Sequence, residues 1–138
     1  MHRRTFLASA AALAAAGPAL AGAGAGAEYT PGLVEKELAA GKTVFIDFYT
    51  GWCSTCRSQE RTITSFLSKN PAYEQNISFI AVDWDVHSKS KLARKHNIPR
   101  RSTLLALKGD QEIGRIVAST RKNDIKALMD KALGVATA

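Results

Sequence analysis

Two stretches of the chain are apolar along nearly their whole length, which predicts strands that are buried on both faces. Residues 43–49 are almost continuously β-branched or aromatic, and residues 77–84 form a second run of the same kind. Such runs are typical of central strands in a sheet covered by helices on both sides. Between the two runs, apolar residues recur at helical spacing until Asn70 and Pro71 end the pattern. This order of strand, helix and strand predicts a parallel pair.

The rest of the chain continues the alternation of helices and strands. We predict a first helix over 31–40 capped by Thr30, a short helix from Ser88 to His96, a hairpin of strands 103–108 and 113–118, and a last helix over 120–133 that Gly134 ends. Together these elements predict one α/β domain with a mixed sheet of about four strands and helices on both faces.

Residues 1–27 have the layout of an export signal. Arg3 and Arg4 precede a weakly apolar stretch, and small residues follow as far as Ala27. The arginine pair resembles a bacterial twin-arginine signal, which directs export of folded proteins. The apolar stretch is shorter than the roughly 20 residues of a membrane span, so an uncleaved anchor is the lesser alternative. We predict a cleaved twin-arginine signal peptide over 1–27, a periplasmic location and a mature domain over 28–138. Small-x-small cleavage sites end at Ala21, Ala23, Ala25 and Ala27.

The chain is basic, with 19 Lys and Arg against 12 Asp and Glu and a formal net charge of +7. Several cations lie between Lys89 and Arg101, where they would suit an acidic partner or an anionic membrane surface, or form a solvated face. No aromatic residues alternate with these cations, so we expect no nucleic-acid partner.

Cys53 and Cys56 lie where the first long strand leads into a helix. Unpaired backbone N–H groups and the positive end of the helix dipole stabilise a thiolate at such a position. Because the thiolate is the attacking species, we expect Cys53 to face solvent and to attack a partner disulfide. Cys56, one turn deeper, would resolve the mixed disulfide. Run backwards, the same steps oxidise a partner dithiol.

Two other roles for the cysteine pair are less well supported. A bridge between Cys53 and Cys56 would be a poor structural staple, because so short a ring removes little entropy from the unfolded chain. A metal site would need further ligands, and His87 and His96 lie far from the cysteines in the sequence. We therefore favour disulfide exchange and predict no metal site.

The segment from Val44 to Cys56 resembles the active-site strand and loop of the thioredoxin family, and the likeness extends over residues 43–133. The segment from Cys56 to Glu60 also resembles, more weakly, the C-terminal domain of DsbD-type thiol transporters, in which an acidic residue follows the second cysteine. The resemblance implies a thioredoxin-like fold, dithiol–disulfide exchange with protein partners, and no bound cofactor.

The same resemblance implies roles for two residues near the cysteines. Asp47 would accept the proton of Cys56 during resolution, and burial without a partner should raise its pKa. Trp52 would shield the thiols and contact the substrate. The alternatives are an aspartate held by backbone hydrogen bonds and a tryptophan that only packs in the core. Thioredoxins often place a lysine near this acid, and the aligned position here is Ala81, so we expect different proton chemistry.

The chain departs from the family in the loop that faces the cysteines. The family has a cis-proline before a Thr, whereas this chain has Ser102 before Thr103, and Pro99 stands three residues too early. A cis bond before a non-proline residue costs about 3 kcal/mol, so we expect a trans bond between Arg101 and Ser102, which reshapes the loop. A strained cis bond held by its surroundings is the lesser alternative. We expect Ser102 to hydrogen-bond the Cys53 thiolate, and Arg101, Ser102 and Thr103 to contact the substrate.

We predict a monomeric periplasmic thiol–disulfide oxidoreductase that acts as a reductase and receives electrons from a membrane-embedded dithiol protein. The dipeptide Ser54-Thr55 matches neither reducing nor strongly oxidising members of the family. The predicted direction of electron transfer, toward the partner, therefore rests on the residues from Asp47 to Trp52 alone. A copper(I) metallochaperone, since soft thiolates select that ion, and a redox-inactive binding module are the alternatives.

Overall fold

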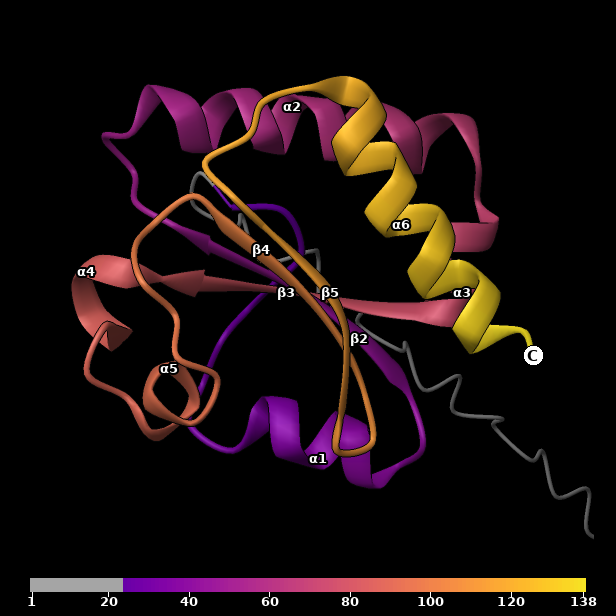
Figure 1. The fold of residues 1–138 in the computed structure, drawn as a ribbon, viewed down its shortest axis with the longest axis horizontal. Helices are drawn as coiled ribbons and strands as arrows, with labels where there is room; N and C mark the ends of the chain where they lie inside the picture. Colours follow the sequence, from indigo (N-terminus) through magenta and orange to yellow (C-terminus); the bar gives the residue numbers. More distant parts are fainter. Residues whose placement is uncertain (1–23) are drawn as a thin grey trace, which may run out of the picture.

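The computed structural model describes residues 24–138, which form a five-stranded mixed sheet between two layers of helices (Figure 1). The strands are β1 (Ala27–Glu28), β2 (Thr43–Tyr49), β3 (Ile77–Asp83), β4 (Thr103–Lys108) and β5 (Gln111–Val117). Their order in the sheet is β1-β3-β2-β4-β5, with β2 parallel to β3 and antiparallel to β4. The predicted mixed sheet is confirmed, with the two-residue β1 as an additional edge strand.

The helices cover both faces of the sheet. They are α1 (Leu33–Ala39), α2 (Ser54–Lys69), α3 (Ala72–Asn76), α4 (Trp84–His87), α5 (Lys91–Lys95) and α6 (Lys122–Ala136). One face carries α2, α3 and α6, and the other carries α1 and α5 (Figure 1). Within the described part of the chain, no helix has the length and hydropathy that a bilayer crossing requires.

Two predicted helix starts are wrong. The first helix begins at Leu33, after Gly32 with φ 90°, and Thr30 does not cap it. The predicted helix from Ser88 to His96 is shorter in the structure, because α5 covers only Lys91–Lys95. Ser90 rather than Ser88 caps α5, and its hydroxyl accepts a hydrogen bond from the Ala93 N–H. The separate short helix α4 lies before Ser88 and was not predicted.

The predicted end of the last helix is also wrong. The helix α6 passes through Gly134 and ends at Ala136. Leu133 and Ala136 both pack against the core, so burial of the last turn outweighs the weak helix propensity of glycine.

Side chains of β2 alternate between the two faces of the sheet. Val44, Ile46 and Phe48 pack with the helices α1 and α5, whereas Phe45 packs with α2, α3 and α6. Asp47 shares the face of Phe45. This alternation places a carboxyl group in the buried layer beneath α2.

The fold begins before Glu28, the residue predicted to start the mature domain. Ala25 is 5% exposed and belongs to the core, and Ala27 and Glu28 pair with β3 as the edge strand β1. Arg3, Arg4 and the rest of the predicted signal up to residue 23 lie outside the described residues.

Candidate active site

Cys53 caps the helix α2. Its sulfur accepts a hydrogen bond from the backbone N–H of Cys56 at 3.2 Å, and both cysteines are free thiols. This geometry agrees with the position predicted at the helix start. The expectation that Cys53 faces solvent is wrong, because its exposure is only 4%, while Cys56 is fully buried. The loop that contains Ser102 covers the two sulfurs.

Ser102 bridges the two cysteines. Its hydroxyl oxygen lies 3.3 Å from the sulfur of Cys53 and 3.1 Å from the sulfur of Cys56. Among residues 24–138 every peptide bond is trans, as expected for the bond before Ser102. Ser102 adopts a left-handed φ of 63°, and its N–H donates to the carbonyl of Phe48 at 2.7 Å. Proline could provide neither the positive φ nor the N–H.

Gln59 holds the Ser102 loop from below. Its side-chain amide donates to the carbonyls of Ser102 and Ser119, both at 3.0 Å, and the residue is fully buried. Gln59 is not among the site residues predicted from the sequence. Its position on α2 gives a signal, because it follows Cys56 by three residues and precedes Ile63 by four, which places all three on the buried face.

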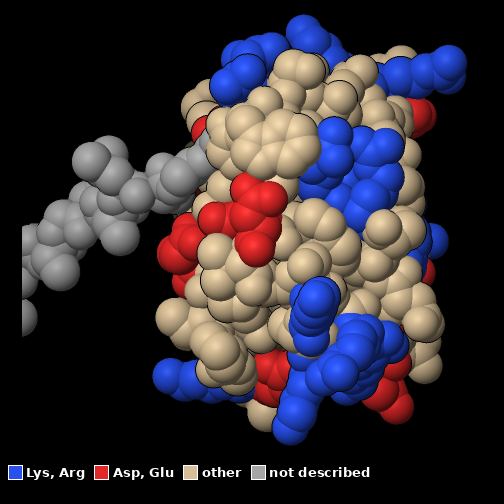
Figure 2. Space-filling view, turned by 90° about the vertical axis from the view of Figure 1, so that its left-hand side faces the viewer, with Lys and Arg blue, Asp and Glu red and all other residues tan. Residues whose placement is uncertain are grey.

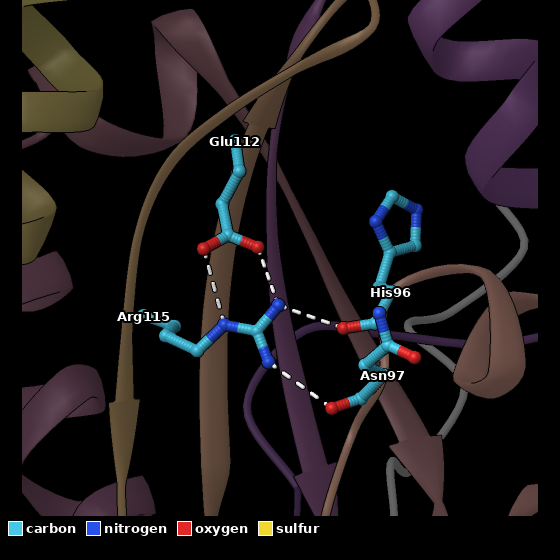
Figure 3. Close-up of polar contacts among 4 residues, drawn as sticks. All are labelled: His96, Asn97, Glu112 and Arg115. Carbon is cyan, nitrogen blue, oxygen red and sulfur yellow. Dashed lines mark hydrogen bonds and ion pairs between the residues drawn. The ribbon is translucent and has the colours of Figure 1, made fainter.

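Arg115 fixes the other end of this loop (Figure 3). Its guanidinium binds both carboxylate oxygens of Glu112 and donates to the backbone carbonyls of His96 and Asn97. Arg115 therefore anchors the segment that leads to Ser102 where it leaves α5. The hydrogen bond from the Ser102 N–H to Phe48 anchors the same segment where it enters β4. Such anchoring keeps the hydroxyl of Ser102 beside the cysteines without rearrangement.

Trp52 lies at the rim of the site. Its side chain is 60% exposed, its indole N–H donates to Asp85 at 2.9 Å, and the guanidinium of Arg101 lies 4.4 Å from the ring centroid. This exposure excludes plain core packing. Figure 2 views the molecule from the side on which α4 and the first turn of α2 lie, and shows uncharged surface bordered by separate acidic and basic groups. The contact between Trp52 and Asp85 was not predicted from the sequence.

Thr103 does not reach this surface. It is fully buried at the start of β4, and its hydroxyl donates to the carbonyl of Arg100 at 2.8 Å. Ser102 is also fully buried, so the direct substrate contacts that the sequence predicted for the side chains of Ser102 and Thr103 are not available in this structure. Thr103 instead closes the turn that presents Arg101.

The pKa values of the Cys53 and Cys56 thiols are shifted in opposite directions. Burial alone would raise the pKa of the Cys53 thiol, but hydrogen bonds from Cys56, Ser102 and Arg101 outweigh burial and lower this pKa to about 6. Burial, followed by the hydrogen bond to Cys53, raises the pKa of Cys56. At neutral pH the pair therefore holds one thiolate and one thiol, with the negative charge on Cys53.

Asp47 is a buried acid behind the cysteines. One of its carboxylate oxygens accepts a hydrogen bond from the backbone N–H of Ala25 at 3.0 Å, and the other has no hydrogen-bond partner among the described residues. Burial raises the pKa of Asp47 to about 7, helped by the charges of Glu60 and Cys53 and opposed by the hydrogen bond from Ala25. This agrees with the predicted rise. Ala81 is the register partner of Asp47 on β3, as the alignment indicated.

Metal-binding groups are sparse in the described part of the chain. Between residues 24 and 138, no three or more His, Cys, Asp and Glu side chains come together in a way that could hold a metal ion. Cys53 and Cys56 supply sulfur, which suits disulfide exchange without further ligands.

Cys53 forms a thiolate at the start of α2, and the thiol of Cys56 lies one turn deeper in the same helix, above a sheet that has β2 as its central strand. This arrangement defines a thiol–disulfide oxidoreductase. Comparison with known proteins leads to the same class. The thioredoxin family model matches residues 28–131, so the chain belongs to the thioredoxin family. Its activity is the exchange of the Cys53–Cys56 dithiol with disulfides of protein partners.

Individual relatives agree with this assignment. The chain is 31% identical to an H-type thioredoxin of Oryza sativa subsp. indica over 75% of this chain and 79% of the relative. It is 33% identical to a mitochondrial thioredoxin-2 of Schizosaccharomyces pombe over 66% and 61% of the two chains. A crystal structure of Trxlp from Edwardsiella tarda superposes with a TM-score of 0.63 and 28% identity, over 75% of this chain and 95% of that one. The thioredoxin-like fold is thereby confirmed.

Proposed function

We propose that this protein is an exported reductase of protein disulfides. The observation that carries the proposal is the stabilised sulfur of Cys53, which receives hydrogen bonds from the Cys56 N–H and the Ser102 hydroxyl. A thiol with a pKa of about 6 is mostly thiolate at neutral pH, which is the form that attacks a disulfide.

The reaction proceeds in two exchange steps. The Cys53 thiolate attacks one sulfur of the partner disulfide, forming a Cys53–partner disulfide and releasing the other partner sulfur as a thiolate that takes up a proton. Cys56 then loses its proton, attacks the sulfur of Cys53 and releases the second partner thiol. Two electrons pass to the partner, and Cys53 and Cys56 end as a disulfide.

Asp47 serves as the proton acceptor for Cys56. It shares the buried layer with the cysteine cluster, in which its register partner Ala81 packs, and the charge on Cys53 raises its pKa. A carboxyl with a pKa near 7 can take a proton at neutral pH and return it in the reverse reaction.

Trp52 and Arg101 form the contact surface for the partner, and Ser102, which is fully buried, acts on the sulfur of Cys53 from behind this surface. Trp52 offers an exposed ring whose position is fixed by Asp85 and Arg101, so a substrate chain meets a rigid aromatic platform beside the sulfur of Cys53. The protein acts as a monomer, and a membrane-embedded dithiol protein restores its reduced state.

Mixed-disulfide trapping tests the exchange reaction. Cys56→Ser should accumulate a covalent complex with a peptide disulfide, detected by intact mass, whereas Cys53→Ser should form none. Wild-type protein should turn over the same peptide when a reduced dithiol is supplied. A Cys53→Ser variant that reduces the peptide as fast as wild type would contradict the assignment of the nucleophile.

Export is proposed from Arg3 and Arg4 and from the apolar and small residues that follow them. The test is fractionation of a bacterium that has a twin-arginine pathway and expresses the full chain. Wild-type protein should be found in the periplasm, and the double variant Arg3→Lys, Arg4→Lys should remain in the cytoplasm. Equal distribution of the two proteins would overturn this localisation.

A further inference from the structure

The segment Gly24 to Gly26 lies directly against the buried acid of the site. The backbone N–H of Ala25 donates to the carboxylate of Asp47 at 3.0 Å, and this contact is buried. It joins residues 22 positions apart in the chain. No other described residue hydrogen-bonds the Asp47 carboxylate, since its second oxygen lacks a partner between residues 24 and 138.

The two glycines are what allow this segment to lie so close. A Cβ at Gly24 would stand 2.4 Å from the ring of Tyr49 and 2.7 Å from the Cβ of Ala81. A Cβ at Gly26, where φ is 116°, would stand 2.4 Å from the carbonyl oxygen of Phe79. These approaches are closer than real Cβ atoms make, so side chains at either position would displace the segment from β3.

The small side chain of Ala81 completes the fit. Ala81 is the register partner of Asp47, and it leaves the space above β3 that Gly24 occupies. The following residues hold the segment in place, because Glu28 pairs with Ala81 in β1 and accepts a hydrogen bond from the Tyr49 hydroxyl.

We propose that the Gly24–Ala25–Gly26 segment is a positioning element for Asp47, in which the Ala25 amide orients the carboxylate that serves the resolving cysteine and the glycines keep water from it. This inference rests on the proposed role of Asp47 in disulfide exchange. The amide provides one polar partner for a buried acid on which the negative charges of Glu60 and Cys53 also act. Its register partners on the neighbouring strands, Ala81 and Leu104, are uncharged.

If the Ala25 amide positions Asp47, the mature protein must keep Ala25 after signal cleavage. Signal cleavage at the sites that end at Ala25 or Ala27 would remove the Ala25 amide, whereas cleavage after Ala23 or Ala21 would keep it. The mature protein must therefore begin no later than Gly24. Intact-mass analysis of protein recovered from an exporting bacterium should give a first residue of Gly24 or earlier. A mature chain that starts at Gly26 or Glu28 would overturn the proposal.

An amide-to-ester exchange tests the hydrogen bond itself. Replacing Ala25 by lactic acid in the full chain removes the N–H and changes the shape little. The pKa of Asp47, followed by the infrared band of its protonated carboxyl against an Asp47→Asn reference, should rise by about one to two pH units. The pH midpoint for resolution of a trapped mixed disulfide should rise with it.

A side chain at Gly24 tests the cover over the acid. Gly24→Ala should push the segment away and admit water. Burial raises the pKa of Asp47 more than the Ala25 hydrogen bond lowers it, so this pKa should fall toward its ordinary value even though that bond is lost, opposite to the effect of the ester. Gly134→Ala is the matched control for a glycine substitution, because Gly134, like Gly24, has no positive φ and has open space around its Cβ position. Thermal unfolding of each variant establishes that it is folded.

The outcomes separate this proposal from the proposed function. If wild-type protein exchanges disulfides but the pKa of Asp47 is the same in wild type, ester and Gly24→Ala, the positioning role is wrong and the oxidoreductase assignment stands. If the wild-type protein does not exchange disulfides at all, the proposed function fails, whatever the titration of Asp47 shows.

Discussion

The hydroxyl of Ser102 lies 3.3 Å from the sulfur of Cys53, in the loop where the thioredoxin family has a cis-proline. The same hydroxyl lies 3.1 Å from the sulfur of Cys56, so one side chain contacts both reacting atoms. A proline cannot donate a hydrogen bond, and this loop therefore stabilises the thiolate in a way that the family's usual residue does not.

Removal of the Ser102 hydroxyl should make the thiolate of Cys53 less stable relative to the thiol. In Ser102→Ala, the pKa of Cys53 should rise by about one pH unit, because a hydrogen bond to a charged sulfur is lost. Thiolate absorbance recorded against pH measures the change. Ser68→Ala, which removes an exposed hydroxyl on the same helix as the cysteines, should leave the titration unchanged. An unchanged pKa in Ser102→Ala would show that the hydroxyl does not act on Cys53.

Restoring the family residue should damage the fold rather than improve it. Ser102→Pro loses the N–H bond to Phe48 and cannot adopt a φ of 63°, so the free energy of unfolding should fall by more than about 2 kcal/mol. Ser102→Gly is the control, because glycine keeps the N–H and accepts positive φ. Urea unfolding should show a much larger free energy of unfolding for Ser102→Gly than for Ser102→Pro. Equal stability of the two variants would mean that the loop readily adopts another conformation.

Much of this arrangement could be predicted from the sequence, and the reasons for the exceptions are specific. The continuous apolar run from Thr43 to Tyr49 predicts a central strand, because a strand buried on both faces does not alternate apolar and polar residues. The helix start at Cys53 could be predicted because apolar residues recur at helical spacing after this point. The likeness to thioredoxins predicted the burial of Asp47. These features depend on residues close together in the chain.

The missed features depend on contacts between distant segments. Gln59 is polar on a helix and gives no sign that it binds the carbonyls of Ser102 and Ser119. Ala25 falls among the small residues of a predicted signal, where only tertiary packing shows that its N–H meets Asp47. Burial of Cys53 follows from the loop above it, which the helix pattern cannot indicate.

Gln59 should be required for the order of the loop. Gln59→Leu removes the side-chain donor from the part-buried carbonyl of Ser119 and from the buried carbonyl of Ser102, which keeps the N–H of Ala118. The free energy of unfolding should therefore fall by about 1 to 3 kcal/mol. Amide hydrogen exchange of Ser102 should also become faster. Gln75→Leu, an exposed position on α3, is the control and should change neither quantity. Unaltered exchange at Ser102 in Gln59→Leu would show that other contacts suffice to hold the loop.

The raised pKa of Asp47 should appear in the pH dependence of stability. An unfolded aspartate titrates near pH 4, whereas the folded carboxyl titrates at about 7, so between these values the folded state keeps a proton that the unfolded state has lost. The contribution of Asp47 to the free energy of unfolding should therefore fall by about 4 kcal/mol as the pH rises from about 4 to about 7, and then level off.

Asp47→Asn removes this effect while keeping the shape of the side chain and an acceptor for Ala25. Compared with wild type, the variant should gain about 4 kcal/mol between pH 4 and pH 8. Urea unfolding of both proteins measures the difference, with each carrying Cys53→Ser so that the titration of the nucleophile, whose charge acts on Asp47, does not enter the comparison. Parallel stability curves would mean that Asp47 keeps its ordinary pKa in the fold.

The reduction potential of the Cys53–Cys56 couple, measured in glutathione buffers with Cys56→Ser as the blank, tests the central claim most directly. A lower nucleophile pKa stabilises the dithiol form, and a value of about 6 lies between those of thioredoxin and of the strong bacterial oxidants, closer to thioredoxin. We predict a reversible two-electron couple at about −230 mV, which is the potential of a reductase. A potential near about −120 mV would contradict the reductase role, and the absence of any reversible couple would contradict the assignment as an oxidoreductase.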